Sequence, residues 1–147
     1  MCLDRVTKIF VKPSSKEVIA YKIVKLRSNS FNMPKQGSKF VTWYRDADMP
    51  MGRWIVDQKC LPGHNKIYST LGKVSYRKGF HVLLDRARAE EKARTMHQAV
   101  VVRVVVKGCV ALGIEGVKHQ AAAVGVFTHL KVVEVLSNEG ATWQARN

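Results

Sequence analysis

The sequence has few cysteines and no long apolar run, and each shortage excludes a class of protein. The three cysteines, Cys2, Cys60 and Cys109, are odd in number and widely spaced, so they predict no disulfide framework. Free thiols are typical of a reducing compartment. The longest apolar stretch, residues 99–106, contains Arg103 and falls short of the roughly 18 residues that span a bilayer.

Recognisable catalytic and metal-binding motifs are also missing. The chain has no P-loop, no nucleophile elbow and no metalloprotease helix, and its 11 Asp and Glu residues are scattered. Cys60 and His64 have a Cys-x3-His spacing, but no second pair of ligands lies at the usual zinc spacing. We therefore expect no metal and no cofactor, and a binding protein is favoured over an enzyme.

Length and composition indicate one ordinary folded domain. Apolar residues make up 46% of the 147 residues, and a chain of this size buries roughly 70% of its unfolded surface without help from disulfides. We expect a single domain over residues 1–147 with a polar tail from about residue 137. The first five residues lack the charged-then-apolar order of a signal peptide, so a cytoplasmic location is expected.

Charge is the extreme property of this chain. Its 25 Lys and Arg residues outnumber 11 Asp and Glu residues, which gives a net charge of +14. Residues 1–60 carry +7, residues 61–107 carry another +7, and residues 108–147 are neutral. A basic surface in the first two-thirds of the chain favours nucleic acid or a nucleoprotein complex as the partner. The alternative is a charge that only keeps the protein soluble.

Hydrophobic periodicity predicts an α+β fold, a mainly antiparallel or mixed sheet with one short surface helix. Asp85 is a suitable N-cap for a helix over residues 86–96, in which Glu90 and Arg94 have favourable i,i+4 spacing. The nearly continuous valines of 99–106 predict a strand buried on both faces and ended by the glycines that follow, Gly108 and Gly113. Other predicted strands are 17–26, 39–44, 79–84 and 130–136, with turns at 13–15 and 60–65, while 120–126 is ambiguous.

Two groups of cations are candidates for phosphate contacts. One is a cationic helix face with its neighbours, namely Arg77, Lys78, Arg86, Arg88, Lys92 and Arg94. The other is the stretch 40–54, which interleaves aromatic residues with Arg45 and Arg53, a combination that can stack bases and hold phosphates. The alternatives are a solvated helix face for the first group and core anchors for Trp43 and Trp54 in the second.

Residues 78–113 resemble the central part of ADP-ribosyltransferase domains. The strand 79–82, Gly-Phe-His-Val, matches the first strand of that part, and the helix and strand that follow match the rest. The resemblance implies an ADP-ribosyltransferase-like fold with a pocket for nicotinamide adenine dinucleotide (NAD), whose candidate residues are Tyr21, Lys22, Phe80 and His81. Lys22 replaces the family's Arg or His. Only position suggests Glu115 and Glu134 as the catalytic carboxylate.

The order Met1-Cys2-Leu3, Tyr21-Lys22 and Gly79-Phe80-His81 also resembles short uncharacterised proteins of phages and mobile elements. That resemblance implies an accessory protein acting on host machinery or host defence, such as an anti-CRISPR. The leading interpretation is a small, basic, non-enzymatic protein that engages nucleic acid or a nucleoprotein complex. The alternatives are an ADP-ribosyltransferase-like domain that binds or uses NAD, and a module that binds an acidic protein surface, such as that of a host protein.

Overall fold

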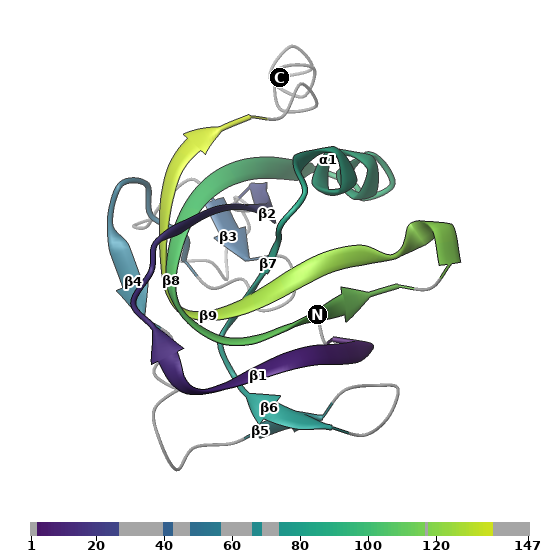
Figure 1. The fold of residues 1–147 in the computed structure, drawn as a ribbon. Helices are drawn as coiled ribbons and strands as arrows, with labels where there is room; N and C mark the ends of the chain where they lie inside the picture. Colours follow the sequence, from purple (N-terminus) through teal and green to yellow (C-terminus); the bar gives the residue numbers. More distant parts are fainter. Residues whose placement is uncertain are drawn as a thin grey trace.

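The computed structural model describes residues 3–26, 40–42, 48–56, 66–68, 74–116 and 118–136 (Figure 1). Their elements are β1 (Arg5–Ser14), β2 (Val18–Leu26), β3 (Phe40–Thr42), β4 (Trp54–Val56), β5 (Lys66–Tyr68), β6 (Ser75–Arg77), β7 (Phe80–Leu83), α1 (Arg86–Arg94), β8 (Ala99–Glu115), the 3-10 turn η2 (Lys118–Gln120) and β9 (Ala122–Val135). The pairings between these strands are antiparallel. The prediction of a mainly antiparallel sheet with one short helix is confirmed. No helix in this part of the chain has the length and apolar character needed to cross a membrane.

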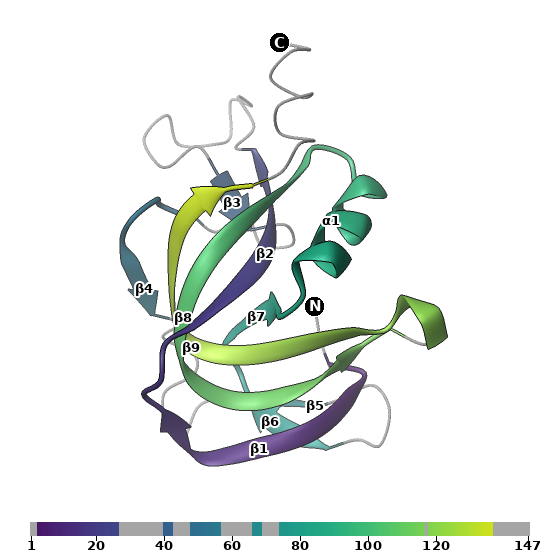
Figure 2. The same ribbon diagram turned by 45° about the horizontal axis from the view of Figure 1, so that its top comes forward.

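Four strands of the sheet close on one another. β8 pairs with β9, β9 with β7, β7 with β2, and β2 with β8. β1 adds to β8, β4 to β9 and β3 to β2, whereas β5 and β6 form a separate pair. Figures 1 and 2 show β8 and β9 as two long, strongly curved ribbons around which the other strands are arranged. β1, β3 and β4 are therefore the edge strands of this sheet.

One face of the first half of β8 is buried throughout, whereas the other is buried at Ala99 and Val101 and only half-buried at Arg103 and Val105, so the prediction from the valine run is confirmed in part. Val101 packs with α1 in the helix-side cluster, whose buried members are Leu3, Ile23, Tyr76, Leu83, Ala89, Ala93, Ala99, Val101, Val110, Ala111, Ala122, Val124 and Val126. Val100 and Val102 point the opposite way. They belong to the β3-side cluster, which comprises Ala20, Val24, Phe40, Met49, Val82, Val100, Val102, Val104, Val106, Cys109, Phe127, Leu130 and Val132.

β8 does not end at its glycines, and this corrects the predicted strand boundary. The strand runs for 17 residues through Gly108 and Gly113. β2 is its partner up to Val106, and β1 is its partner from Cys109 onward. Gly108, between the two, has a φ of +75°, and a Cβ there would overlap the Thr128 hydroxyl on β9. Glycine therefore allows the strand to bend and change partner instead of ending it.

Other differences from the predicted strands have similar causes. β1 was not predicted, because most of its side chains are exposed on both faces and give no alternation of apolar and polar residues. The ambiguous segment 120–126 supplies the start of β9, which continues without a break into the predicted strand 130–136. The predicted turn at 60–65 and the polar tail from residue 137 lie outside the described residues.

α1 begins where the sequence predicts. The Asp85 carboxylate accepts hydrogen bonds from the backbone N–H groups of Ala87, at 2.8 Å, and Arg88, at 3.4 Å, so it caps the first turn. The helix ends at Arg94, two residues before the predicted end, where Thr95 donates its hydroxyl proton to the Lys92 carbonyl. The small side chains of Ala89 and Ala93 let the helix approach β2 and β8 closely.

A buried polar network fixes the N-terminal segment to β6 and β7. The backbone N–H of Leu3 donates to the Tyr76 hydroxyl at 2.9 Å, and this hydroxyl lies 3.0 Å from His81 Nε2. His81 Nδ1 lies 3.2 Å from the Gly79 carbonyl, which can only accept. Nδ1 therefore carries a proton, and in the neutral ring Nε2 would accept from the Tyr76 hydroxyl.

The Gly108→Ala substitution should destabilise the fold strongly. A positive φ costs alanine about 1–2 kcal/mol, and the overlap with Thr128 adds about 1–3 kcal/mol of strain. Gly52→Ala is a matched control, because Gly52 has a φ of +71° but a Cβ there would meet no atom within 4 Å. Urea denaturation should show a clearly larger loss for Gly108→Ala. Equal losses would mean that the contact with Thr128 has no role.

Tyr76→Phe should lower the free energy of unfolding by about 1–3 kcal/mol, because it removes the hydrogen-bond partner of two buried groups. The control is Tyr21→Phe, which deletes the same oxygen from a half-buried side chain against the same cluster. Its expected loss is within about 0.5 kcal/mol. Chemical denaturation of both variants compares them, and a neutral Tyr76→Phe would contradict the network.

Candidate nucleic-acid interface

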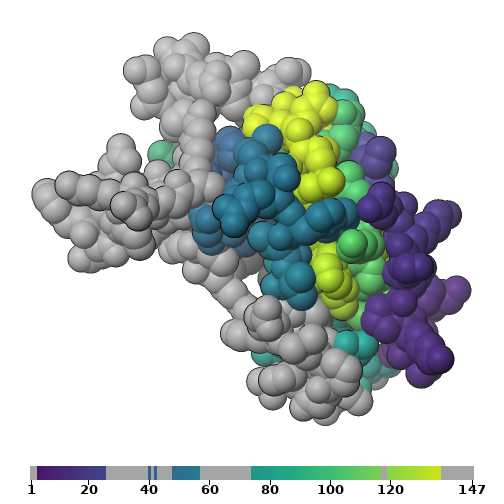
Figure 3. Space-filling view, turned by 90° about the vertical axis from the view of Figure 1, so that its left-hand side faces the viewer, coloured from purple at the N-terminus to yellow at the C-terminus, as the bar shows by residue number. Residues whose placement is uncertain are grey.

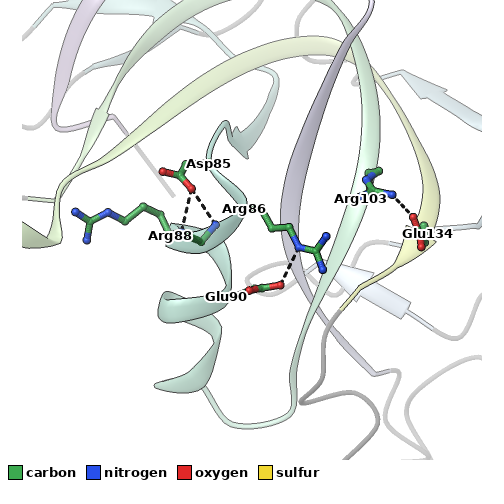
Figure 4. A network of polar contacts seen from close by, with 7 residues as sticks. Asp85, Arg86, Arg88, Glu90, Arg103 and Glu134 are labelled. Carbon is green, nitrogen blue, oxygen red and sulfur yellow. Dashed lines mark hydrogen bonds and ion pairs between the residues drawn. The ribbon is translucent and has the colours of Figure 1, made fainter.

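The cations of α1 lie beside carboxylates. Arg86 pairs with Glu90 at 3.0 Å, and this pairing replaces the predicted one between Glu90 and Arg94 (Figure 4). Arg88 pairs with Glu91 at 3.2 Å and donates to the His119 carbonyl, and Lys92 pairs with Glu115. The Glu90 carboxylate raises the pKa of Arg86 further above its ordinary value.

These pairs leave little positive charge at the helix. From Asp85 to Arg94 there are four positive and three negative side chains, so the segment carries +1. Arg86 and Arg88 are two positions apart, about 200° around a helix, so the cations do not share one face. Of the remaining candidates, Arg53 and Arg94 are exposed, Arg77 and Lys78 are half-buried, and Arg45 lies outside the described residues.

A different group of cations surrounds an aromatic ring on the sheet. Lys107 Nζ lies 4.3 Å from the centre of the Trp54 ring, and Lys131 Nζ lies 4.9 Å from it. Both distances are within the roughly 6 Å range of cation–π attraction. Trp54 is half-buried and belongs to neither core cluster. Neither lysine forms an ion pair with any residue that the structure describes.

Strand register explains how these residues meet. Ile19, Val105, Lys131 and Trp54 are successive cross-strand partners on β2, β8, β9 and β4. In the next row, Lys107 is opposite His129 and His129 is opposite Val56. Directly opposed residues share one face of a sheet. We call this surface the open sheet face; its members are Ile19, Trp54, Val56, Val105, Lys107, His129 and Lys131.

The helix covers only one end of this side of the sheet. Ile23 and Val101 pack under α1, whereas Ile19, four residues earlier on β2, is 59% exposed. Figure 3 shows the side of the molecule where residues of β4, β9, β8 and β1 lie next to one another. One carboxylate stands in the neighbouring row, Glu134, and it pairs with Arg103 (Figure 4). The open sheet face therefore combines apolar, aromatic and cationic side chains.

The pKa of His129, a member of this face, is lowered by its surroundings. Burial, and then the charge of Lys107, lower its pKa below the ordinary value of 6.5. Its Nδ1 lies 2.6 Å from the hydroxyl oxygen of Thr128, and that hydroxyl donates its proton to the Lys107 carbonyl. The ring is therefore neutral at pH 7 and is held in place next to the bend at Gly108.

The four residues predicted to bind NAD come together, but their side chains do not converge. β2 and β7 pair at Tyr21 and Leu83, and Lys22 Nζ donates to the His81 carbonyl at 2.9 Å. The His81 ring is buried against Tyr76 on the helix side, whereas Phe80 packs against the β3-side cluster. Alternate residues of a strand point to opposite faces, so these side chains line no common pocket.

The two carboxylates suggested as catalytic, Glu115 and Glu134, both form ion pairs with basic side chains. Glu115 pairs with Lys92 and Glu134 with Arg103, on opposite ends of β8 and β9. Cys60 and His64 lie outside the described residues. Within the described ranges, no three His, Cys, Asp or Glu side chains are grouped as metal ligands would be.

Lys107 and Lys131 are the residues that sequence reasoning missed. Lys107 follows the valine run directly, and Lys131 comes from the third of the chain with no net charge. Lys131 falls within the predicted strand 130–136. No pattern in the sequence indicates which strand is its neighbour, so its contact with Trp54 could not be predicted.

His129 should make the stability of the protein depend on pH. Its pKa is lower in the folded than in the unfolded chain, so the unfolded state takes up the proton first as the pH falls below about 6.5. The contribution to stability is therefore full above that pH and is lost as the pH falls through the folded-state pKa. The free energy of unfolding at pH 7.5 and pH 5 should differ less in His129→Gln than in the wild type. An identical difference in both proteins would refute the shift.

No family model matches this chain, and no curated protein or solved structure matches it either. A function for the chain must therefore come from the chemistry of its own residues.

Proposed function

We propose that this chain is a small, basic, non-enzymatic binding protein that engages nucleic acid or a nucleoprotein complex through the open sheet face. The observation that supports this most is the position of Lys107 and Lys131 at the ring of Trp54. Aromatic rings offer stacking surfaces to bases, and adjacent ammonium groups neutralise phosphates. An aromatic ring next to ammonium groups suits a polyanion that also carries flat apolar rings, as nucleic acid does.

The distribution of charge supports the same choice. The chain carries +14, and like charges repel one another unless a counter-charge is near. At α1 the carboxylates of Glu90, Glu91 and Glu115 supply that counter-charge. At the open sheet face, Lys107 and Lys131 have no such partner among the described residues. A phosphate chain would supply the counter-charge there.

The setting we propose is that of a phage or mobile-element accessory protein directed against host defence, such as an anti-CRISPR. The resemblance of Met1–Leu3, Tyr21–Lys22 and Gly79–His81 to such proteins is the support for it. Defence complexes of the CRISPR type contain guide RNA and a displaced single strand of DNA, and the phosphates of both are targets for a basic surface. An accessory protein of this kind would therefore need no catalytic group of its own.

Two alternatives differ in what the cations would meet. An acidic protein surface would attract Lys107 and Lys131 equally well, but its carboxylates themselves offer no flat ring to stack on Trp54. An ADP-ribosyltransferase-like domain that binds NAD would need Tyr21, Lys22, Phe80 and His81 to face one pocket. Their divergent side chains in the described structure give that alternative no support.

Binding to nucleic acid should depend on salt through the lysines of the open sheet face. Log affinity should fall linearly with log salt, with a slope of about −0.9 for each phosphate contact on duplex DNA and about −0.7 on a single strand. The double substitution Lys107→Gln and Lys131→Gln should weaken binding and make the slope shallower by about one such unit for each phosphate that a lysine neutralises. Fluorescence anisotropy of a labelled oligonucleotide over a salt series measures both quantities.

The matched control removes the same charge from α1. Arg86→Gln with Arg88→Gln also deletes two cations, but these lie beside Glu90 and Glu91, so the expected change is smaller. A larger effect in this control would move the interface to the helix. Absence of binding by the wild type at low salt would disprove the proposal. Host proteins captured from a lysate equally well after nuclease treatment would favour an acidic protein partner.

A further inference from the structure

We infer that the open sheet face takes a single strand, with one base stacked on Trp54, and this inference rests on the proposed function. The four members of the first row belong to four neighbouring strands. Strands lie about 4.8 Å apart, so the row Ile19, Val105, Lys131, Trp54 extends over roughly 14 Å. At about 3.4 Å for each stacked nucleotide, this is the length of about four nucleotides.

The order of side chains along the row suits unpaired bases. Trp54 stands at one end, and the ammonium groups of Lys107 and Lys131 lie over its ring. A base that stacks on the face they cover displaces them from the ring toward its phosphates. Ile19 and Val105 occupy the other end, and Ile19 is 59% exposed. Base planes and sugars can cover apolar side chains, while the two ammonium groups meet the phosphates. In a double helix the base planes are stacked inside and could not reach Trp54.

The α-helix among the described residues offers little for reading a duplex. The major groove admits an α-helix whose exposed side chains reach the base edges. The described α-helix, α1, has nine residues and packs along β2 and β8, and its cations Arg86, Arg88 and Lys92 lie against carboxylates. A sheet face with an aromatic ring and cations is instead a common platform for single-stranded nucleic acid.

The test compares a single strand with a duplex on matched variants. The probes are labelled oligo(dT) of about 12 nucleotides, within the site sizes of single-strand binding domains, and a duplex of equal length. Trp54→Ala should weaken oligo(dT) binding at least about fivefold, the equivalent of about 1 kcal/mol of stacking. It should leave the salt slope unchanged, because no charge is removed. Duplex affinity should stay the same, and Trp54→Phe should recover part of the loss.

Tryptophan fluorescence gives a second measurement that does not need Trp54→Ala to fold. The chain has three tryptophans, and Trp54→Phe retains Trp43 and Trp143. The difference between wild-type and Trp54→Phe emission is therefore the Trp54 signal. Oligo(dT) should quench that signal, because a stacked base contacts the ring, and the duplex should not.

The outcomes separate this inference from the proposed function. If Trp54→Ala affects neither probe or both equally, and the Trp54 signal is not quenched by oligo(dT), stacking is wrong. Salt-dependent binding that weakens in the Lys107→Gln, Lys131→Gln protein would still support the proposed function in that case. If the wild type binds neither probe at low salt, both proposals are rejected. If the duplex binds more tightly than oligo(dT), the single-strand preference is wrong.

Discussion

The change of partner in β8 determines how the rest of the sheet is arranged. One edge of this strand pairs with β2 before Gly108 and with β1 after it, while β9 follows the other edge throughout. The bend needs a residue with positive φ and no Cβ, because Thr128 lies where the Cβ would be. Lys107 precedes the bend and is paired with His129. The constraint that closes the fold therefore also positions part of the open sheet face.

Local signals allowed much of the fold to be predicted. Asp85 predicted the start of α1, and the valine run of 99–106 predicted a buried strand, because capping and burial depend on adjacent residues. The continuation of β8 past Gly108 depends on β1 and β9, which are distant in the sequence. A glycine that ends a strand and one that bends it look the same in the sequence.

The candidate site could be predicted only in part, for the same reason. Trp54 and Arg53 stand in a stretch whose aromatic and basic composition is visible. Lys107 and Lys131 reach Trp54 only through the register of β4, β9 and β8. Counting charges along the chain favoured α1, where glutamates lie beside the arginines, and it gave no weight to Lys131 in a segment without net charge.

The cations, the tryptophan and the histidine of the open sheet face act on one another. Attraction to the Trp54 ring restricts Lys107 and Lys131, so less side-chain entropy remains to be lost when an anion binds. Burial, and then the charge of Lys107, lower the pKa of His129. A phosphate at this face would offset the part of that shift that comes from Lys107, whereas the part that comes from burial would remain. Phosphate binding and proton uptake by His129 would then favour each other to the extent of the Lys107 contribution.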